Sequence, residues 1–106
     1  MSGNNPAQNG KRITIKFGYN VAYTIEFEES VIREDIPAIQ QPYKEQIKTA
    51  IRERLTQEPV KLGKPLRYSL FGYRSLRIGD WRVIYKISGS VVKIIKIGNR
   101  KDIYKD

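Results

Sequence analysis

The amino-acid sequence predicts an α+β fold, with a pair of helices packed on one face of an antiparallel sheet of three to five strands. The first observation is an apolar residue at every fourth position between Tyr43 and Leu55, as on one side of a helix. The second is a set of three strand-like segments near the C-terminal end, separated by short turn sequences. Together they give the element order β-α-α-β-β-β, which favours a two-layer α+β arrangement.

The N-terminal part of the chain is expected to supply the first strands. Residues 1–12 predict a disordered or vector-like tail, because the first ten contain no large apolar residue except the initial Met. A single domain is then expected over residues 13–106. Residues 21–27 alternate between apolar and polar side chains and predict a strand. Residues 13–17 alternate in the same way and predict an additional hairpin strand.

Two helices are expected next. Ser30 is a candidate N-cap for a short helix, and Pro37 should end or offset that helix because proline has no backbone N–H. The longer helix is predicted over Tyr43 to Leu55, with Ile47 and Ile51 on its buried side.

The C-terminal half predicts a loop followed by consecutive strands. Gly and Pro are frequent in residues 59–72, which favours an irregular connection. Strands are then predicted over residues 73–78, 81–87 and 91–97. The separating sequences Gly79-Asp80 and Ser88-Gly89-Ser90 are typical hairpin turns.

The composition excludes several kinds of chemistry. The chain has 106 residues and contains neither His nor Cys. A Ser-His-Asp triad, a thiolate nucleophile and zinc sites built on Cys or His are therefore excluded. Any catalysis would depend on Lys, Arg, Tyr, Ser, Asp or Glu, and we expect no metal or other cofactor. No apolar run approaches the roughly 20 residues of a membrane helix, so a cytoplasmic protein without a membrane partner is expected.

Positive charge is concentrated in the second half of the chain. Residues 1–53 contain as many basic as acidic groups, and the net charge of +9 arises within residues 54–106. Such an excess favours a polyanionic partner. Basic residues interleaved with Tyr and Trp on neighbouring strands favour RNA, and the candidate RNA-binding residues are Arg74, Arg77, Lys86, Lys93, Lys96 and Lys101. The alternative for any one of these lysines is a solvated sheet edge, where Lys prevents aggregation.

Two motifs resemble those of a known family. Residues 76–85, read as LRIGDWRVIY, resemble the hairpin of the RelE/ParE toxin superfamily, and residues 97–104, read as IGNRKDIY, resemble its C-terminal signature. The resemblance covers roughly residues 21–105. It implies a small cytosolic toxin of a type II toxin–antitoxin pair, with a sheet that holds RNA and helices packed behind it.

The resemblance also implies roles for three residues. Members close to RelE cut mRNA in the ribosomal A site without a metal. By position in the motifs, Arg82 and Arg100 match catalytic arginines, and Tyr104 matches a C-terminal tyrosine implicated in base stacking or proton transfer. This chain departs from the pattern at Asn99, where many relatives have His, and at Ser75, where RelE has a catalytic Lys. The proton-transfer groups therefore stay open.

The partners and the alternatives follow from the same resemblance. A cognate antitoxin with an acidic, partly disordered segment is expected, together with mRNA on the ribosome. The ParE branch poisons DNA gyrase and is not a nuclease, so a gyrase poison is one alternative. A non-catalytic module that binds nucleic acid or protein through the same basic sheet is another.

Overall fold

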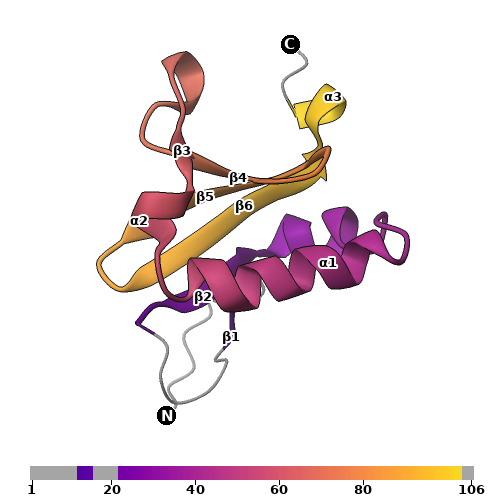
Figure 1. Ribbon diagram of the computed structural model, residues 1–106, viewed down its shortest axis with the longest axis horizontal. Coiled ribbons are helices and arrows are strands. Elements are labelled where there is room, and N and C mark those ends of the chain that lie inside the picture. Colours follow the sequence, from indigo (N-terminus) through magenta and orange to yellow (C-terminus); the bar gives the residue numbers. More distant parts are fainter. Residues whose placement is uncertain (1–11, 16–21, 104–106) are drawn as a thin grey trace.

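The computed structural model describes residues 12–15 and 22–103. The expected tail, residues 1–12, lies outside the described residues except for Arg12, which begins β1. The elements shown in Figure 1 are, in chain order, β1 (Arg12–Ile15), β2 (Thr24–Glu28), η2 (Val31–Asp35), α1 (Tyr43–Ala50), η3 (Ile51–Leu55), α2 (Pro59–Leu62), β3 (Lys64–Pro65), η4 (Tyr68–Leu70), β4 (Arg74–Ile78), β5 (Trp81–Ser88), β6 (Val91–Asn99) and α3 (Arg100–Ile103).

The sheet is mixed, which corrects the prediction of a purely antiparallel one. Six strands lie in the order β1-β2-β6-β5-β4-β3, and β2 runs parallel to β6 while the other neighbours are antiparallel. The parallel pair arises because the helices after β2 carry the chain across the sheet, so that β6 returns beside β2. Turn sequences specify hairpins between adjacent segments but contain no information on such a non-local pairing.

η2 and the α1–η3 segment cover one face of this sheet, as predicted for the helical pair. α1 continues without a break into η3, so a single helical segment spans Tyr43 to Leu55 (Figure 1). Its buried side chains pack against the sheet in one apolar cluster, together with η2. The main sheet contributions to this cluster are Ile25, Phe27, Leu76, Val83, Tyr85, Val92, Ile94 and Ile97. Among the described residues, no helix is both long enough and apolar enough to span a membrane.

The expected N-cap at Ser30 is wrong. Ser30 already has helical dihedral angles, φ −60° and ψ −31°, and its side chain makes no capping hydrogen bond. An N-cap residue needs an extended conformation in order to turn its side chain toward the first helical N–H groups. The other end of the helix agrees with expectation, because η2 stops at Asp35, ahead of Pro37.

The segment predicted as an irregular loop contains three short elements, α2, β3 and η4. Residues 64–73, here called the finger, project from the sheet on the side opposite α1, and α3 projects from the same side at the other end of the strands (Figure 1). Two side chains hold the base of the finger by hydrogen bonds. The Arg74 Nη1 group donates to the carbonyls of Val60 and Gly63, both at 2.9 Å. The Tyr85 hydroxyl donates to the carbonyl of Pro59.

Candidate nucleic-acid interface

Like charges face one another on the side of the sheet opposite α1, here called the outer face. Arg77 on β4 lies directly opposite Arg82 on β5, and Lys86 on β5 lies directly opposite Lys93 on β6. Side chains in such positions are separated by only about 5 Å at Cβ, and like charges there destabilise the sheet. Between the two pairs, β4 and β5 place the uncharged residues Ser75 and Ile84, which are both buried. The outer face therefore concentrates positive charge at a cost to the fold.

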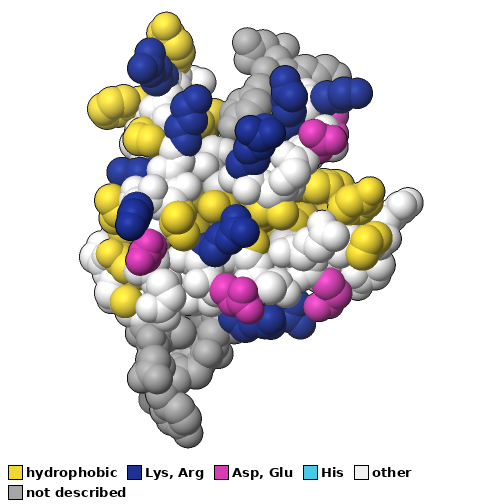
Figure 2. All heavy atoms as spheres, viewed as in Figure 1, with side chains coloured by type: hydrophobic (Ala, Val, Ile, Leu, Met, Phe, Trp, Pro, Cys, Tyr) yellow, Lys and Arg dark blue, Asp and Glu magenta, His cyan; other side chains and the backbone are white. Residues whose placement is uncertain are grey.

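Aromatic rings accompany these cations. The Lys86 ammonium lies 5.8 Å from the centre of the Tyr73 ring, within the range of a cation–π contact. Figure 2 shows Lys and Arg side chains over the two projections of the upper half, where few acidic side chains are visible. Cations interleaved with rings were predicted from the sequence, and for Lys86 and Tyr73 the geometry agrees.

Arg82 is held in a fixed orientation by the turn that precedes it. Its Nη1 group donates to the carbonyl of Gly79 at 2.8 Å and to the carbonyl of Trp81 at 3.0 Å. Gly79 can offer its carbonyl in this way because it takes a left-handed conformation, with φ +61°, in the hairpin turn. These bonds use Nη1 alone, and a guanidinium carries further N–H groups on Nε and Nη2.

Arg100 is attached to the same turn from the other side. Its backbone N–H donates to the carbonyl of Asp80 at 2.8 Å, which joins the start of α3 to the β4–β5 hairpin. The side-chain Oδ1 of Asn99 accepts the N–H of Lys101 at 3.1 Å and so caps α3. The turn Gly79-Asp80 thus organises both arginines that the resemblance marks as catalytic.

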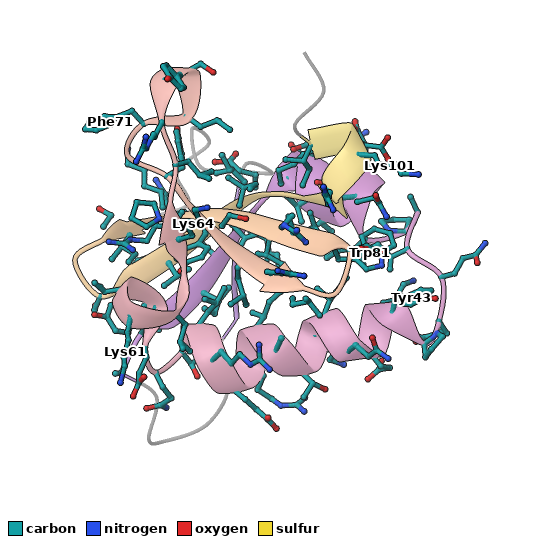
Figure 3. The ribbon with its side chains drawn as sticks, turned by 45° about the horizontal axis from the view of Figure 1, so that its top comes forward. Tyr43, Lys61, Lys64, Phe71, Trp81 and Lys101 are labelled. Atoms are coloured by element: carbon teal, nitrogen blue, oxygen red, sulfur yellow. The ribbon has the colours of Figure 1, made fainter. Side chains whose placement is uncertain are left out.

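A groove lies beside this turn. It is lined by Asp80, Asn99, Arg100, Lys101 and Asp102. Figure 3 shows Lys101 on α3, at the end of the sheet away from the finger. Sequence reasoning assigned the two aspartates to turn and tail positions. The structure puts both aspartates in the lining of the same groove as Arg100, a proximity that chain positions 80 and 102 do not reveal.

The last helix rests on the sheet through one side chain. A Cβ atom added to Gly98 would lie 3.1 Å from Cγ1 of Ile103, so the Ile103 side chain already occupies the space above Gly98. Gly98 is also the β6 neighbour of Arg82. Tyr104, the third predicted catalytic residue, lies outside the described residues.

Two of the predicted RNA-binding residues have partners within the fold. Arg74 holds the base of the finger through the carbonyl bonds given above. The Lys96 ammonium lies 3.3 Å from Oδ1 of Asp35. Lys93 faces Glu26 across the parallel β2–β6 pair, as well as Lys86. The outer-face charge thus centres on Arg77, Arg82 and Lys86.

Sequence reasoning missed two surface features of the fold. The first is the finger, whose only signal is a stretch without Asp or Glu from residue 59 to residue 79. The second is an apolar groove of about 300 Å³ between η2 and α1, lined chiefly by Ile32, Ile36, Ile39, Ile47 and Ile51, with Lys44, Glu45 and Lys48 also in its lining. Helical periodicity places isoleucines on a buried stripe and cannot show that a groove remains between η2 and α1.

Comparisons with known proteins agree on one family. Residues 25–104 match the family described as the ParE toxin of the type II toxin–antitoxin system parDE. Toxin RelG of Mycobacterium tuberculosis is 42% identical over 53 residues, which cover 48% of this chain and 61% of the relative. Toxin RelE of the same organism is 45% identical over 53 residues, covering 48% of this chain and 55% of the relative. The matched segments thus span little more than half the length of these relatives.

Solved structures give the same result for the fold. The toxin–antitoxin complex RelBE2 from Mycobacterium tuberculosis contains a chain that superposes with a TM-score of 0.69 at 30% identity, covering 77% of this chain and 95% of that one. The RelB–RelE complex from Methanococcus jannaschii contains a chain with a TM-score of 0.60 at 20% identity, covering 74% of this chain and 94% of that one, and it supports the fold alone. The hairpin motif, the C-terminal motif and the fold lead to one conclusion: this chain belongs to the ParE toxin family, within the RelE/ParE superfamily.

Proposed function

We propose that this protein is a toxin that cleaves mRNA on the translating ribosome, without a metal ion. The observation that carries the proposal is the pair of arginines tied to one turn, Arg82 through its side chain and Arg100 through its backbone, beside the like-charge pair of Arg77 and Arg82. A fold that keeps two arginines at directly opposed strand positions gives up stability unless an anion neutralises them. RNA phosphates supply that charge.

The proposed reaction is an attack by the 2′-oxygen of a nucleotide on its own 3′-phosphorus. The bond from the 2′-oxygen to phosphorus forms, the bond from phosphorus to the 5′-oxygen of the next nucleotide breaks, and a 2′,3′-cyclic phosphate remains. Negative charge grows on the non-bridging oxygens during this step. Arg82 and Arg100 are assigned to stabilise it, and a preorganised donor of this kind contributes roughly 3–4 kcal/mol.

Two proton movements accompany the attack, one from the 2′-hydroxyl and one to the departing 5′-oxygen. Arginine is a poor base because its pKa exceeds about 12. Tyr104 is the candidate from the sequence motif, and Asp80 and Asp102 are further candidates because they line the groove with Arg100. Tyr85 is not suited to this role, because burial raises its pKa to about 12 and its hydroxyl is bonded to Pro59.

The test is primer extension on a defined mRNA in a purified translation system. The wild-type chain should produce breaks inside translated codons. Arg82→Ala and Arg100→Ala should each reduce the cleavage rate by about 100-fold or more. Arg52→Ala is the matched control, because Arg52 is an exposed arginine on η3, on the helix side of the sheet, and it should cleave like the wild type.

Gyrase poisoning is the second candidate function, since the matched family carries the ParE name. The same proteins should therefore be assayed for inhibition of DNA supercoiling and for trapped DNA–gyrase complexes. Intact mRNA combined with trapped complexes would show that the nuclease proposal is wrong and that the outer face binds another partner. Intact mRNA and active gyrase would leave the non-catalytic binding module.

We further propose a cognate antitoxin with an acidic, partly disordered segment as the protein partner. The net charge of +9 and the apolar groove between η2 and α1 support it, because an acidic segment with apolar anchors would meet both. The RelBE2 structure is a toxin–antitoxin complex, which supports an antitoxin as the partner. Co-expression with the protein from an adjacent reading frame should restore growth and yield a stable complex. Replacing Ile32, a partly buried residue of the groove lining, with Lys should weaken that complex.

A further inference from the structure

Two aromatic rings at the tip of the finger are almost completely exposed. The exposed fraction is 91% for Tyr68 and 81% for Phe71. Figure 3 shows Phe71 pointing outward from the end of the finger, away from the sheet. Rings exposed to this degree contribute almost nothing to the core, and two of them in one turn form an apolar patch that the fold itself does not use.

The backbone of Tyr68 is strained in a way that maintains this exposure. Its φ angle is +58°, in the left-handed region, which is strained for a bulky residue. Backbone hydrogen bonds within the turn keep it there, from Leu70 N–H to the Arg67 carbonyl at 3.1 Å and from Phe71 N–H to the Tyr68 carbonyl at 3.0 Å. Glycine would adopt this conformation without strain. The Tyr68 ring is therefore kept at a position where any side chain causes backbone strain.

The finger is rigid at its base, so the tip is presented at a fixed place. Leu66 N–H donates to the Tyr73 carbonyl at 2.9 Å, and β3 pairs with the start of β4. The Arg74 bonds to the carbonyls of Val60 and Gly63 attach the base to the sheet below. A preorganised support lowers the entropy lost when the tip binds a ligand.

The charge around the rings indicates the ligand. Lys64 and Arg67 lie on the finger, and no carboxylate occurs between Glu58 and Asp80. Aromatic rings with cations around them are typical of surfaces that bind single-stranded nucleic acid, with bases stacked on the rings and phosphates neutralised by the cations. A protein partner would gain little from a projecting tip, because a convex surface buries a small area. RNA bases can stack on rings that stand free.

We propose that the finger is a second RNA contact, separate from the cleavage groove, in which Tyr68 and Phe71 stack on unpaired bases while Lys64 and Arg67 bind the adjoining phosphates. Tyr73 and Lys86, in contact at 5.8 Å, lie between the base of the finger and the outer face and continue the same surface. This inference rests on the proposed function. Because the finger and α3 stand at opposite ends of the strands (Figure 1), the contact affects how tightly RNA is held and leaves the chemical step unchanged.

The experiment measures binding of an unstructured RNA with 2′-O-methyl groups, which cannot undergo 2′-attack, by fluorescence anisotropy. The double variant Tyr68→Ala with Phe71→Ala should bind this RNA about 10-fold or more weakly, and Tyr68→Phe should bind like the wild type. The matched control is Val60→Ala, which removes an exposed apolar side chain at the base of the finger, 53% exposed. It should leave RNA binding unchanged.

A second variant distinguishes function from structure. Tyr68→Gly relieves the left-handed strain and should raise the melting temperature, while it weakens RNA binding. A purely structural role would make both quantities fall together. On ribosomes, the double variant should raise the KM for mRNA cleavage and leave kcat unchanged.

The outcomes separate the two proposals. If the wild type cleaves no RNA, the proposed function is wrong whatever the finger does. If the wild type cleaves and the double variant keeps its RNA affinity and KM, only the finger inference is wrong. The inference is also overturned if a fully paired duplex binds as tightly as the single strand, or if the double variant loses its antitoxin and keeps its RNA affinity.

Discussion

The carboxylate of Asp35 accepts the backbone N–H of Ile97 at 2.9 Å, at an edge of β6 where no strand of the described residues pairs with it. The parallel pairing of β2 with β6 ends at the Phe27–Ile94 position, and β6 continues beyond it. An unpaired N–H at that edge would be costly, since the Ile97 side chain is buried. Oδ1 of the same carboxylate lies 3.3 Å from the Lys96 ammonium. η2 is thereby joined to the sheet by a polar contact in addition to its apolar side.

Replacement of Asp35 should therefore destabilise the fold in proportion to what is left unpaired. Asp35→Ala removes the acceptor of the Ile97 N–H and is expected to lower the free energy of unfolding by about 2–3 kcal/mol. Asp35→Asn keeps an oxygen acceptor and loses only the charge, so a loss of about 1 kcal/mol is expected. Urea unfolding at pH 7 measures both. Equal losses for the two variants would mean that the ion pair with Lys96, and not the backbone bond, carries the stabilisation.

Tyr85 should make the stability sensitive to alkaline pH. Burial raises its pKa to about 12, against an ordinary value of 10.0, so between these values the tyrosine is ionised in the unfolded chain and neutral in the folded protein. The unfolded state then binds fewer protons, and the free energy of unfolding falls as the pH rises through this window, by up to about 2–3 kcal/mol. Tyr85→Phe should lack this decline. Denaturant unfolding from pH 9 to pH 11.5 compares the two proteins.

At neutral pH the wild type should be the more stable of the two proteins. Tyr85→Phe leaves the Pro59 carbonyl without its donor and should be about 1–2 kcal/mol less stable than the wild type. The two curves should therefore approach each other as the pH rises. Parallel curves would mean that the Tyr85 hydroxyl is less well shielded from water than its position suggests.

Arg77 should show a conflict between stability and RNA binding. Arg77→Gln removes the like-charge contact with Arg82 and is expected to raise the free energy of unfolding by about 0.2–1 kcal/mol. The same change should weaken RNA binding and reduce the slope of log affinity against log salt by about 0.7. Thermal unfolding and salt titrations measure the two effects. Arg52→Gln is the matched control and should leave the salt dependence unchanged. Loss of stability in Arg77→Gln would contradict the argument from paired charges.

Two deletions at the C-terminal end should have different effects on cleavage and on thermal stability. Deletion of residues 104–106 removes Tyr104 and keeps the Ile103 contact with Gly98, so we expect a loss of cleavage with an unchanged melting temperature. Deletion of residues 103–106 also frees α3 and should lower the melting temperature by a few degrees. The two truncated proteins are compared by calorimetry and by growth inhibition. Full toxicity after either deletion would exclude a catalytic role for Tyr104.

The sequence by itself determined the local elements of this protein. The isoleucine stripe specified the helical segment from Tyr43 to Leu55, and Gly79-Asp80 specified the turn between β4 and β5. These features follow from residues close together in the chain, where side-chain period and turn chemistry suffice. The family resemblance, carried by two short motifs, is likewise a property of the sequence and is confirmed.

The tertiary structure alone decided which distant residues meet. It put β2 parallel to β6, Asp35 against the edge of β6, and Asp80 and Asp102 in one groove with Arg100. In the folded protein Arg74, a predicted RNA-binding residue, donates hydrogen bonds that hold the base of the finger. The physical reason is that burial and hydrogen-bond satisfaction are settled over the whole fold at once. The sequence does not show whether a basic residue will donate its hydrogen bonds to a phosphate or to a carbonyl of its own chain.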